Sequence, residues 1–287
     1  MTQLPLRLAS LLVCVIGSVS VLAQSSRNSH LYRNTPAFGV VKLSVGTGIS
    51  YYMGDMRAKT DLRFIQPHIA AAITYRLAER FSVRGEIDFY RISGKQEGGP
   101  IWYNNLSFRS DNPAGYVGLQ ADLFRYHDER AVNPYLFGGI GITRITPKAQ
   151  YQGTWHSLAP LQTEGVAYKR NVRIGVIGIG TSWKFNERWS FAVELSNNYA
   201  NSDYLDDVST VYPNPTGMSE LALQLSDRRP ELDPATLPTG YPVRNEAGAQ
   251  RGNPKVKDSY GFLSFRAEYL LGTQARRAER RKLKCYY

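Results

Sequence analysis

The chain has 287 residues, a formal net charge of +11, 19 tyrosines, 25 glycines and only two cysteines. It lacks the long helical periods that an α/β enzyme of this size needs, and the single cysteine left after removal of the N-terminal leader excludes an internal disulfide framework. Abundant tyrosine and glycine in short alternating segments instead indicate an all-β chain of the barrel type.

The N-terminus has the composition of an export signal. Arg7 supplies a short positive region, residues 8–22 are almost wholly apolar, and Val21-Leu22-Ala23 places short side chains where a signal peptidase reads them. The apolar stretch is too short and too poorly flanked to be a spanning helix. We therefore expect residues 1–23 to be a signal peptide that is cleaved after Ala23.

Eight stretches of the mature chain alternate with a period of two, as β-strands do when one face is apolar. The third of them carries Phe81 and Ile87 on one face and Arg84, Glu86 and Asp88 on the other. Three charges at alternate positions would disrupt the core of a sandwich, but they can pair inside a barrel. The eight predicted strands cover residues 41–51, 64–77, 81–90, 115–125, 135–146, 173–185, 189–196 and 263–271.

Charged side chains on the second face of these strands predict a salt-bridged network inside the barrel. Eight strands leave an interior about wide enough for side chains alone, so a plug is favoured over a transport path. A small channel or transporter barrel of unknown substrate is the alternative, and it would need a wider lumen. The expected members of the network are Arg76, Arg84, Glu86, Asp88, Glu194, Arg266 and Glu268.

The connections between the predicted strands alternate in length. Short turns at 78–80, 127–133 and 186–188 alternate with long loops at 53–63, 94–106, 147–172 and 200–257. Short turns at one rim and long loops at the other are typical of outer-membrane barrels, in which the short turns face the periplasm. We therefore predict an eight-stranded antiparallel transmembrane β-barrel, integral to the outer membrane, with long extracellular loops. Its parts would be an N-terminal periplasmic segment (24–38), the barrel (39–271) and a basic periplasmic tail (272–287).

Motifs for catalysis or metal binding are weak throughout the chain. The Gly-rich runs at 138–141 and 175–180 are not followed by a helix, so strand curvature explains them better than a phosphate loop. The acidic run at 203–209 lacks the glycine and the closing glutamate of a calcium loop, and a structural cap or a partner surface is favoured for the loop that contains it. The four histidines, which show no metal-ligand spacing, are His30, His68, His127 and His156.

These absences predict that the protein is not an enzyme and has no catalytic, cofactor-binding or metal-binding residues. A serine-nucleophile motif of the Gly-x-Ser-x-Gly type does not occur. A lipid-modifying barrel enzyme, which would need an outward-facing His and Ser near the outer rim, ranks last among the hypotheses.

The C-terminal end is strongly basic, with six positive residues and Glu279 as the one negative residue, a net charge of +5. Contact with anionic headgroups or with an acidic periplasmic protein is the favoured role, and a solvated basic end is the alternative. Cys285 is a leftover thiol in an exported chain and predicts a disulfide to a periplasmic partner. Nucleic acid is not expected as a partner after export. The expected partner-binding residues are Cys285, Arg276, Arg277, Arg280, Arg281, Lys282 and Lys284.

Several short motifs together resemble a known family. The residues 52–55 (YMGD), 204–209 (YLDDVS), 251–254 (RGNP) and 258–262 (DSYGF), with a basic end and a late cysteine, are similar to Bacteroidota outer-membrane β-barrels of the PorG type, from the type IX secretion system. The similarity extends over nearly the whole mature chain, and the family also includes members without a known role. It implies a barrel that connects the outer membrane to a periplasmic ring built from a lipoprotein and its partner (PorK/PorN-like).

Overall fold

The computed structural model describes residues 38–56, 64–126, 128, 130–186, 188–254 and 257–271. Ten strands dominate it, and eight of them form one closed sheet. The strands of that sheet are β1 (Val41–Met53), β2 (Gln66–Arg76), β3 (Phe81–Lys95), β4 (Ser107–Asp122), β5 (Val132–Arg144), β8 (Asn171–Lys184), β9 (Trp189–Ala200) and β10 (Ser259–Leu271). The other two, β6 (Pro147–Tyr151) and β7 (Thr154–Ser157), form a hairpin that continues the edge of β4.

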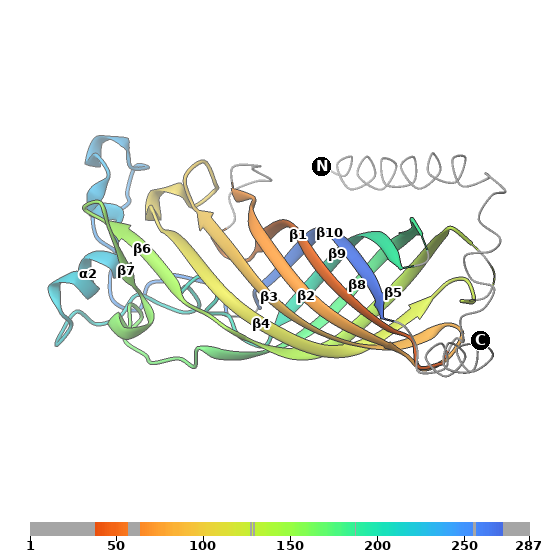
Figure 1. Ribbon diagram of the computed structural model, residues 1–287. Helices are drawn as coiled ribbons and strands as arrows, with labels where there is room; N and C mark the ends of the chain where they lie inside the picture. The colour runs from red at the N-terminus through yellow and green to blue at the C-terminus, as the bar shows by residue number, and fades with distance from the viewer. Residues whose placement is uncertain are drawn as a thin grey trace, which may run out of the picture.

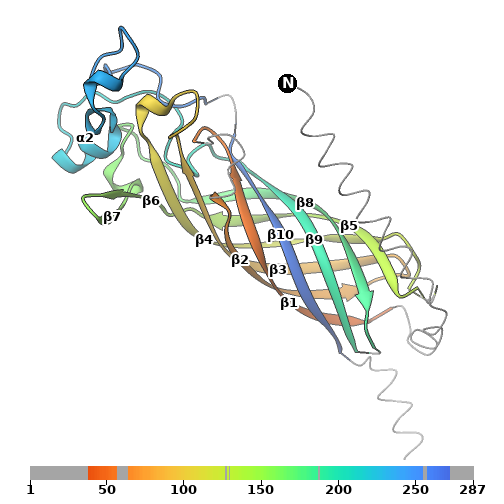
Figure 2. The same ribbon diagram turned by 90° about the horizontal axis from the view of Figure 1, so that it is seen from above.

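The sheet closes into a barrel because every one of the eight strands has two antiparallel neighbours. Strands that follow one another along the chain pair in sequence, β5 pairs with β8 across the β6–β7 hairpin, and β1 pairs with β10 over its whole length. The strands tilt around a common axis and leave a cap at one end (Figures 1 and 2). The predicted eight-stranded antiparallel barrel is therefore confirmed.

Side chains alternate between the wall and the lumen as predicted. On β3, Arg84, Glu86 and Asp88 are buried while Ile87 and Phe89 are exposed. On β10, Ser264, Arg266 and Glu268 are likewise buried and Phe265 is exposed. The interior of this barrel is thus polar at mid-height and its outer wall is apolar, which is the reverse of a water-soluble sandwich.

Four strands extend at least four residues further towards the cap than the alternation predicted. β3 continues to Lys95, β4 begins at Ser107, β9 continues to Ala200 and β10 begins at Ser259. In the extensions of β3 and β4 the polarity is inverted, because Ile92 and Phe108 point inward and are buried while Arg91 and Arg109 are partly exposed on the outside. An apolar-out pattern cannot detect strands that have left the hydrocarbon layer, and this explains why the prediction stopped short.

Glycines allow β4 and β5 to approach closely on the lumen side. Gly118 pairs with Gly139, and a Cβ added at Gly139 would lie 2.4 Å from the Val117 carbonyl oxygen. Larger residues would force the two strands apart, so the Gly-rich run that resembled a phosphate loop serves strand curvature.

The long-loop end of the barrel carries a folded cap. We call residues 145–170 and 201–258 the cap; they include the β6–β7 hairpin, η3 (Ala159–Leu161), α2 (Glu220–Ser226), η4 (Arg229–Glu231) and η5 (Pro234–Thr236), and η2 (Trp102–Asn104) lies beside them. Ala149, Leu158 and Leu225 form a small apolar core that joins the hairpin to α2. The predicted loop at 147–172 therefore contains two strands and a helical turn that its sequence did not reveal.

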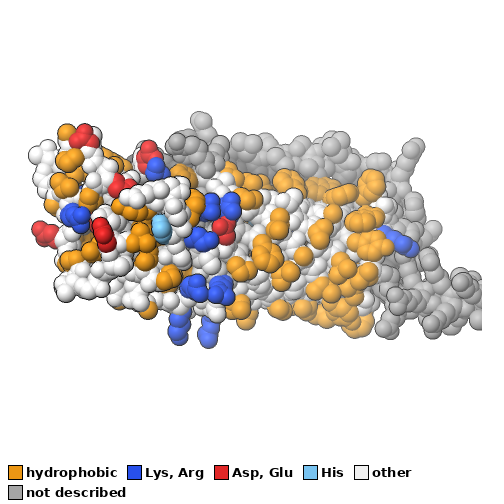
Figure 3. Space-filling view, turned by 60° about the vertical axis from the view of Figure 1, so that its left-hand side comes forward, with side chains coloured by type: hydrophobic (Ala, Val, Ile, Leu, Met, Phe, Trp, Pro, Cys, Tyr) orange, Lys and Arg blue, Asp and Glu red, His pale blue; other side chains and the backbone are white. Residues whose placement is uncertain are grey.

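The outer wall of the barrel is covered with large apolar side chains. They are far more exposed than core residues would be, with Ile140 79% exposed and Val117 62% exposed. Aromatic residues gather at the short-turn rim, where Phe38 packs edge-on against Tyr75, and Trp189 packs against Tyr269. In Figure 3, hydrophobic side chains cover the part of the barrel away from the cap, and Lys and Arg side chains gather nearer the cap. A continuous apolar wall with an aromatic girdle at one rim is what a lipid-embedded barrel presents.

Among the described residues, no helix is both long enough and apolar enough to cross a membrane.

Candidate functional site: a charged lumen beneath a locked cap

A network of two arginines and two glutamates crosses the middle of the lumen. Arg84 donates to both carboxylate oxygens of Glu194, from Nη1 at 2.7 Å and from Nη2 at 2.8 Å, and its Nε donates to Glu86 at 2.7 Å. Arg266 completes the network with a hydrogen bond to Glu86 and an Nε contact to Glu194 at 2.5 Å that lacks hydrogen-bond alignment. The four side chains come from β3, β9 and β10 and carry no net charge together. They cross the lumen as one neutral group, which we call the Arg84–Glu194 bolt.

Aromatic groups complete this network. Tyr135 donates to Glu194 at 2.5 Å and Tyr116 donates to Glu86 at 3.1 Å, so the carboxylates accept further hydrogen bonds beside those from arginine. The Arg84 guanidinium lies 4.5 Å from the centre of the Phe137 ring. Buried ion pairs are favourable only when their remaining polar atoms also find partners. These contacts supply partners for the two glutamates, whereas Nε and Nη1 of Arg266 are buried without a hydrogen bond.

Two further ion pairs fill the lumen towards the short-turn rim. Arg76 donates to Asp122 at 2.6 Å, and Gln120 donates to the other oxygen of the same carboxylate at 2.8 Å. Lys42 donates to both oxygens of Glu268, at 3.0 and 3.1 Å. The lumen therefore contains charge pairs from this rim up to mid-height.

Above the network, His68 lies between an acid and a hydroxyl. Its Nε2 is 2.8 Å from Asp88 Oδ1 and its Nδ1 is 3.2 Å from Ser264 Oγ, while its ring stacks on Phe262 at a centroid distance of 3.8 Å. The three groups resemble a catalytic relay in composition. His68 is 0% exposed, however, so a substrate could reach the three only if the barrel wall opened.

Aromatic and aliphatic layers close the upper lumen. Tyr90 stacks on Tyr260 at 4.4 Å and its hydroxyl is 2.8 Å from Thr143 Oγ1. Above them, one cluster of buried apolar side chains continues into the cap; among its members are Ile92, Phe108, Ile145, Leu205 and Val208. The lumen is thus filled in successive layers, charged below, aromatic in the middle and aliphatic at the top.

A tyrosine hydroxyl that lies between two buried carboxyls fastens the cap to the barrel. The Tyr52 hydroxyl lies 2.7 Å from both Asp206 Oδ2 and Asp258 Oδ1, and Tyr52 has only one hydrogen to donate. One of the two carboxyls must therefore hold a proton of its own. Burial, offset in part by the Tyr52 hydrogen bond, raises the pKa of Asp258 to about 8. Burial and the neighbouring Asp258 raise the pKa of Asp206 well above its usual value. We call these three residues the carboxyl latch.

A second fastening inside the cap is built around Arg251. Its guanidinium is fully buried and donates to Glu164 at 3.0 Å, to the Ser226 carbonyl at 3.1 Å and to the Asp207 carbonyl. Glu164 also accepts from the backbone amides of Ser209 at 2.9 Å and Thr210 at 3.0 Å. Segments far apart in the sequence thus meet at one cation, and we call this group the arginine clasp.

The carboxyl latch predicts that the cap loosens as the pH rises. Because the pKa of Asp258 is raised on folding, the folded cap binds more protons than the open one between about pH 4 and pH 8, and its stability must fall across that interval. Asp55 and Asp203, the other carboxyls near Asp258, add repulsion in the same direction. Amide hydrogen exchange should show protection factors at Leu205 and Val208 that decrease from pH 5 to pH 9.

The matched variant for that experiment is Asp258→Asn. An asparagine mimics the protonated acid, because it can accept from the Leu205 amide, which now donates to Asp258 at 3.0 Å, and donate to Tyr52. Protection in this variant should fall less steeply with pH than in the wild type. A wild-type profile that is already flat, or a variant profile as steep as the wild type's, would contradict a protonated carboxyl in the latch.

The sequence-predicted network residues occupy the lumen in three groups. Arg84, Glu86, Glu194 and Arg266 lie together, and Asp88 pairs with His68 one layer higher. Near the short-turn rim, Arg76 pairs with Asp122 and Glu268 pairs with Lys42. Sequence reasoning missed several of their partners, of which Lys42, Asp122, Tyr116 and Tyr135 all stand at inward positions of the alternation. It also gave no role to Glu164 or to the side chain of Arg251, since the cap has no periodicity.

Other expectations fall elsewhere. The signal peptide, His30, His127, Cys285 and the six basic residues of the tail lie outside the described residues. The acidic run at 203–209 is buried in the cap, where its carboxyls contribute to the latch and the clasp. Within the described part of the chain, no three His, Cys, Asp or Glu side chains gather as a metal site requires.

Comparisons with known proteins give distant structural likenesses. No family model and no curated protein matches the chain. Among solved structures, the chain is similar to the N-terminal β-barrel domain of Pseudomonas aeruginosa OprF, with 8% identity, 82% of this chain and 100% of that chain covered, and a TM-score of 0.38. It is similar to Yersinia pestis Ail (12%, 82% and 99%, 0.40) and to the Pseudomonas aeruginosa outer membrane protein OprG (9%, 84% and 100%, 0.42). Likenesses this distant do not show what the chain binds. The evidence for the barrel is the pairing of its own strands.

Proposed function

We propose that the chain is an integral outer-membrane barrel that acts as a closed structural component of a protein secretion apparatus of the type IX kind. It would anchor or couple periplasmic ring proteins to the outer membrane. The observation that supports a structural role best is the filled lumen, in which the Arg84–Glu194 bolt lies below stacked aromatic rings. A barrel filled in this way supplies position and contact, and its strands fix the membrane depth of whatever binds at either rim.

The secretion role is supported by the sequence resemblance described above and by the distribution of charge. The apolar wall fits a bilayer, and short turns conventionally face the periplasm in outer-membrane barrels. In that orientation the cap would lie outside the cell and the basic tail at 272–287 would lie inside the periplasm, where it could meet a ring lipoprotein and its partner. A disulfide through Cys285 is part of this proposal.

A deletion strain tests the proposed role. Loss of the chain should abolish export of the apparatus's cargo and leave the periplasmic rings detached from the outer membrane. A chain that lacks residues 272–287 should still reach the outer membrane but should no longer crosslink to the ring lipoprotein, and Cys285→Ser should remove only a reducible band on non-reducing gels. Normal secretion and normal ring attachment in the deletion strain would refute the proposal.

A further inference from the structure

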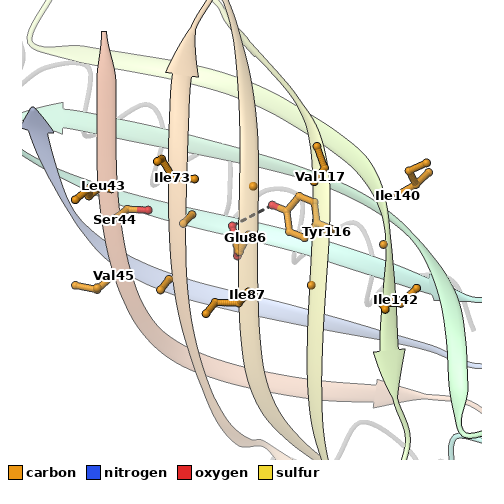
Figure 4. A pocket seen from close by; sticks show the side chains of 15 residues that line it. Leu43, Ser44, Val45, Ile73, Glu86, Ile87, Tyr116, Val117, Ile140 and Ile142 are labelled. Atoms are coloured by element: carbon orange, nitrogen blue, oxygen red, sulfur yellow. Dashed lines mark hydrogen bonds between the residues drawn. The ribbon is translucent and has the colours of Figure 1, made fainter. Parts of the chain in front are cut away.

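A groove runs across the outer wall of the barrel at mid-height. Outward positions on adjacent strands carry small residues there, with Ala71 on β2, Gly85 on β3 and Gly115 on β4, so the wall is hollowed by a depression of about 810 Å³. Figure 4 shows the branched side chains that border it, and Glu86 beneath the groove with its hydrogen bond from Tyr116. The bordering side chains are Leu43, Val45, Ile73, Ile87, Val117, Ile140 and Ile142.

A second depression of about 290 Å³ continues this groove towards the cap. It lies over the next outward rows of the same strands, where Phe89 pairs with Pro113 and Arg91 pairs with Asp111. Ile87 lines the first depression and Phe89 lines the second, and the two are successive outward residues of β3, so the depressions lie next to each other along this strand; we call them together the track. From Gly85 to Arg91 the track covers six residue steps, or about 20 Å of strand, and with strands tilted by about 40° this is about half of the roughly 30 Å hydrocarbon core.

The upper end of the track is basic. Arg91 and Arg109 both lie beside Asp111, with Nε–Oδ distances of 2.5 and 3.7 Å, and Lys148 is the register partner of Arg109. Arg144 is exposed on the adjacent strand β5, one residue beyond the Thr143–Ala114 pair. Arg91 and Arg109 contact Asp111, and Lys148 and Arg144 stand on neighbouring strands, so this basic cluster of four cations and one carboxylate has a net charge of +3. Figure 3 shows Lys and Arg side chains gathered between the apolar wall and the cap.

We propose that this track binds a phosphate-bearing membrane lipid, with an acyl chain in the groove and the headgroup at the basic cluster. The charge favours this occupant over a second copy of the chain, because two copies inserted in the same direction would bring like-charged clusters together. Arginine and lysine are suited to phosphate, and guanidinium groups bind it bidentately. The proposal rests on the membrane embedding in the proposed function and is independent of the secretion role.

Native mass spectrometry of the detergent-solubilised full chain tests the headgroup. Phosphatidylglycerol should be retained in preference to phosphatidylcholine with the same acyl chains. Since each cation near an anionic headgroup contributes about 1 kcal/mol, Arg91→Gln and Arg109→Gln should each lower this preference about fivefold. Asp111→Asn should raise it, and Arg244→Gln, which removes an exposed arginine from the cap, should leave it unchanged. Equal retention of the two lipids, or an equal effect of Arg244→Gln, would overturn the proposal.

A separate variant tests whether an acyl chain occupies the groove. A Cβ at Gly85 would have Ile73 Cγ2, at 3.7 Å, as its only near neighbour, so Gly85→Leu should fold and fill the groove. Retention of phosphatidylglycerol should then fall although the basic cluster is intact. The control is Gly175→Leu on β8, where a Cβ meets nothing within 4 Å. Inorganic phosphate in excess should not displace the lipid. Displacement by phosphate alone, or unchanged retention in Gly85→Leu, would show that no acyl chain occupies the track.

Discussion

Replacing Arg84 with methionine should lower the free energy of unfolding by about 3–5 kcal/mol, because it leaves two buried glutamates, Glu86 and Glu194, with one arginine, Arg266, between them. Arg84 donates to both oxygens of Glu194 and to Glu86, and all three side chains are buried. Methionine retains much of the volume of the arginine side chain, so the loss of stability would reflect the missing charge and not a cavity. Denaturant unfolding in detergent micelles, followed by tryptophan fluorescence, measures it.

A double-mutant cycle separates the network from its parts. Glu194→Gln alone leaves two arginines with one glutamate, whereas Arg84→Met with Glu194→Gln leaves the neutral pair Arg266–Glu86. The double variant should therefore be more stable than the sum of the single effects predicts, by about 0.5–3 kcal/mol. Arg188→Ala, an exposed residue of a short turn, should change stability by no more than about 0.5 kcal/mol. Additive effects in the cycle, or a loss below about 1 kcal/mol for Arg84→Met, would refute the network as a unit.

Replacing Arg251 with alanine should open the cap while the barrel stays folded. The change leaves Glu164 buried and uncompensated and removes hydrogen bonds to the Ser226 and Asp207 carbonyls, which together join three parts of the cap. If the loss is about 3–5 kcal/mol, as for other buried pairs, the open fraction of the cap should rise by a factor on the order of 10² or more. Limited proteolysis should then cut rapidly within residues 201–254.

The control for this experiment is Arg244→Ala, which removes an exposed arginine from the same segment. Its cleavage rate should match the wild type's. In both variants, the unheated barrel should still migrate faster on a gel than the heat-denatured barrel, since the substitutions do not alter the strands. Equal cleavage of Arg251→Ala and wild type would show that the arginine clasp does not hold the cap.

The barrel could be predicted from sequence because a bilayer imposes a simple period. Wherever hydrocarbon wets one face of a strand, apolar residues such as Ile69, Ile73 and Phe89 must alternate with inward polar ones, and this pattern identified all eight strands. The pattern fails where the strand leaves the hydrocarbon. Arg91 and Arg109 then face outward and Phe108 inward, and the alternation reverses although the backbone remains a strand.

The candidate site also has a part that could be predicted from the sequence and a part that could not. The inward charges on β3, β9 and β10 could be identified from alternation, but their pairing depends on which strands face each other across the lumen, and that follows from closure and register. A structural cap was one of the two roles expected for the loop at 200–257, but the contacts that fasten it could not be predicted. Tyr52, Asp206 and Asp258 are separated by more than 150 and about 50 residues and meet only when β1, β9 and β10 are in place. Long-range contacts of this kind leave no periodic trace in a single sequence.

The most direct test of the closed barrel is the conductance of the purified full chain in planar lipid bilayers. The Arg84–Glu194 bolt, the Tyr90–Tyr260 stack and the aliphatic layer above them fill the lumen of the described residues, so we expect insertion to produce no discrete current steps. Sustained steps of uniform size would contradict the account and would favour a small outer-membrane channel instead.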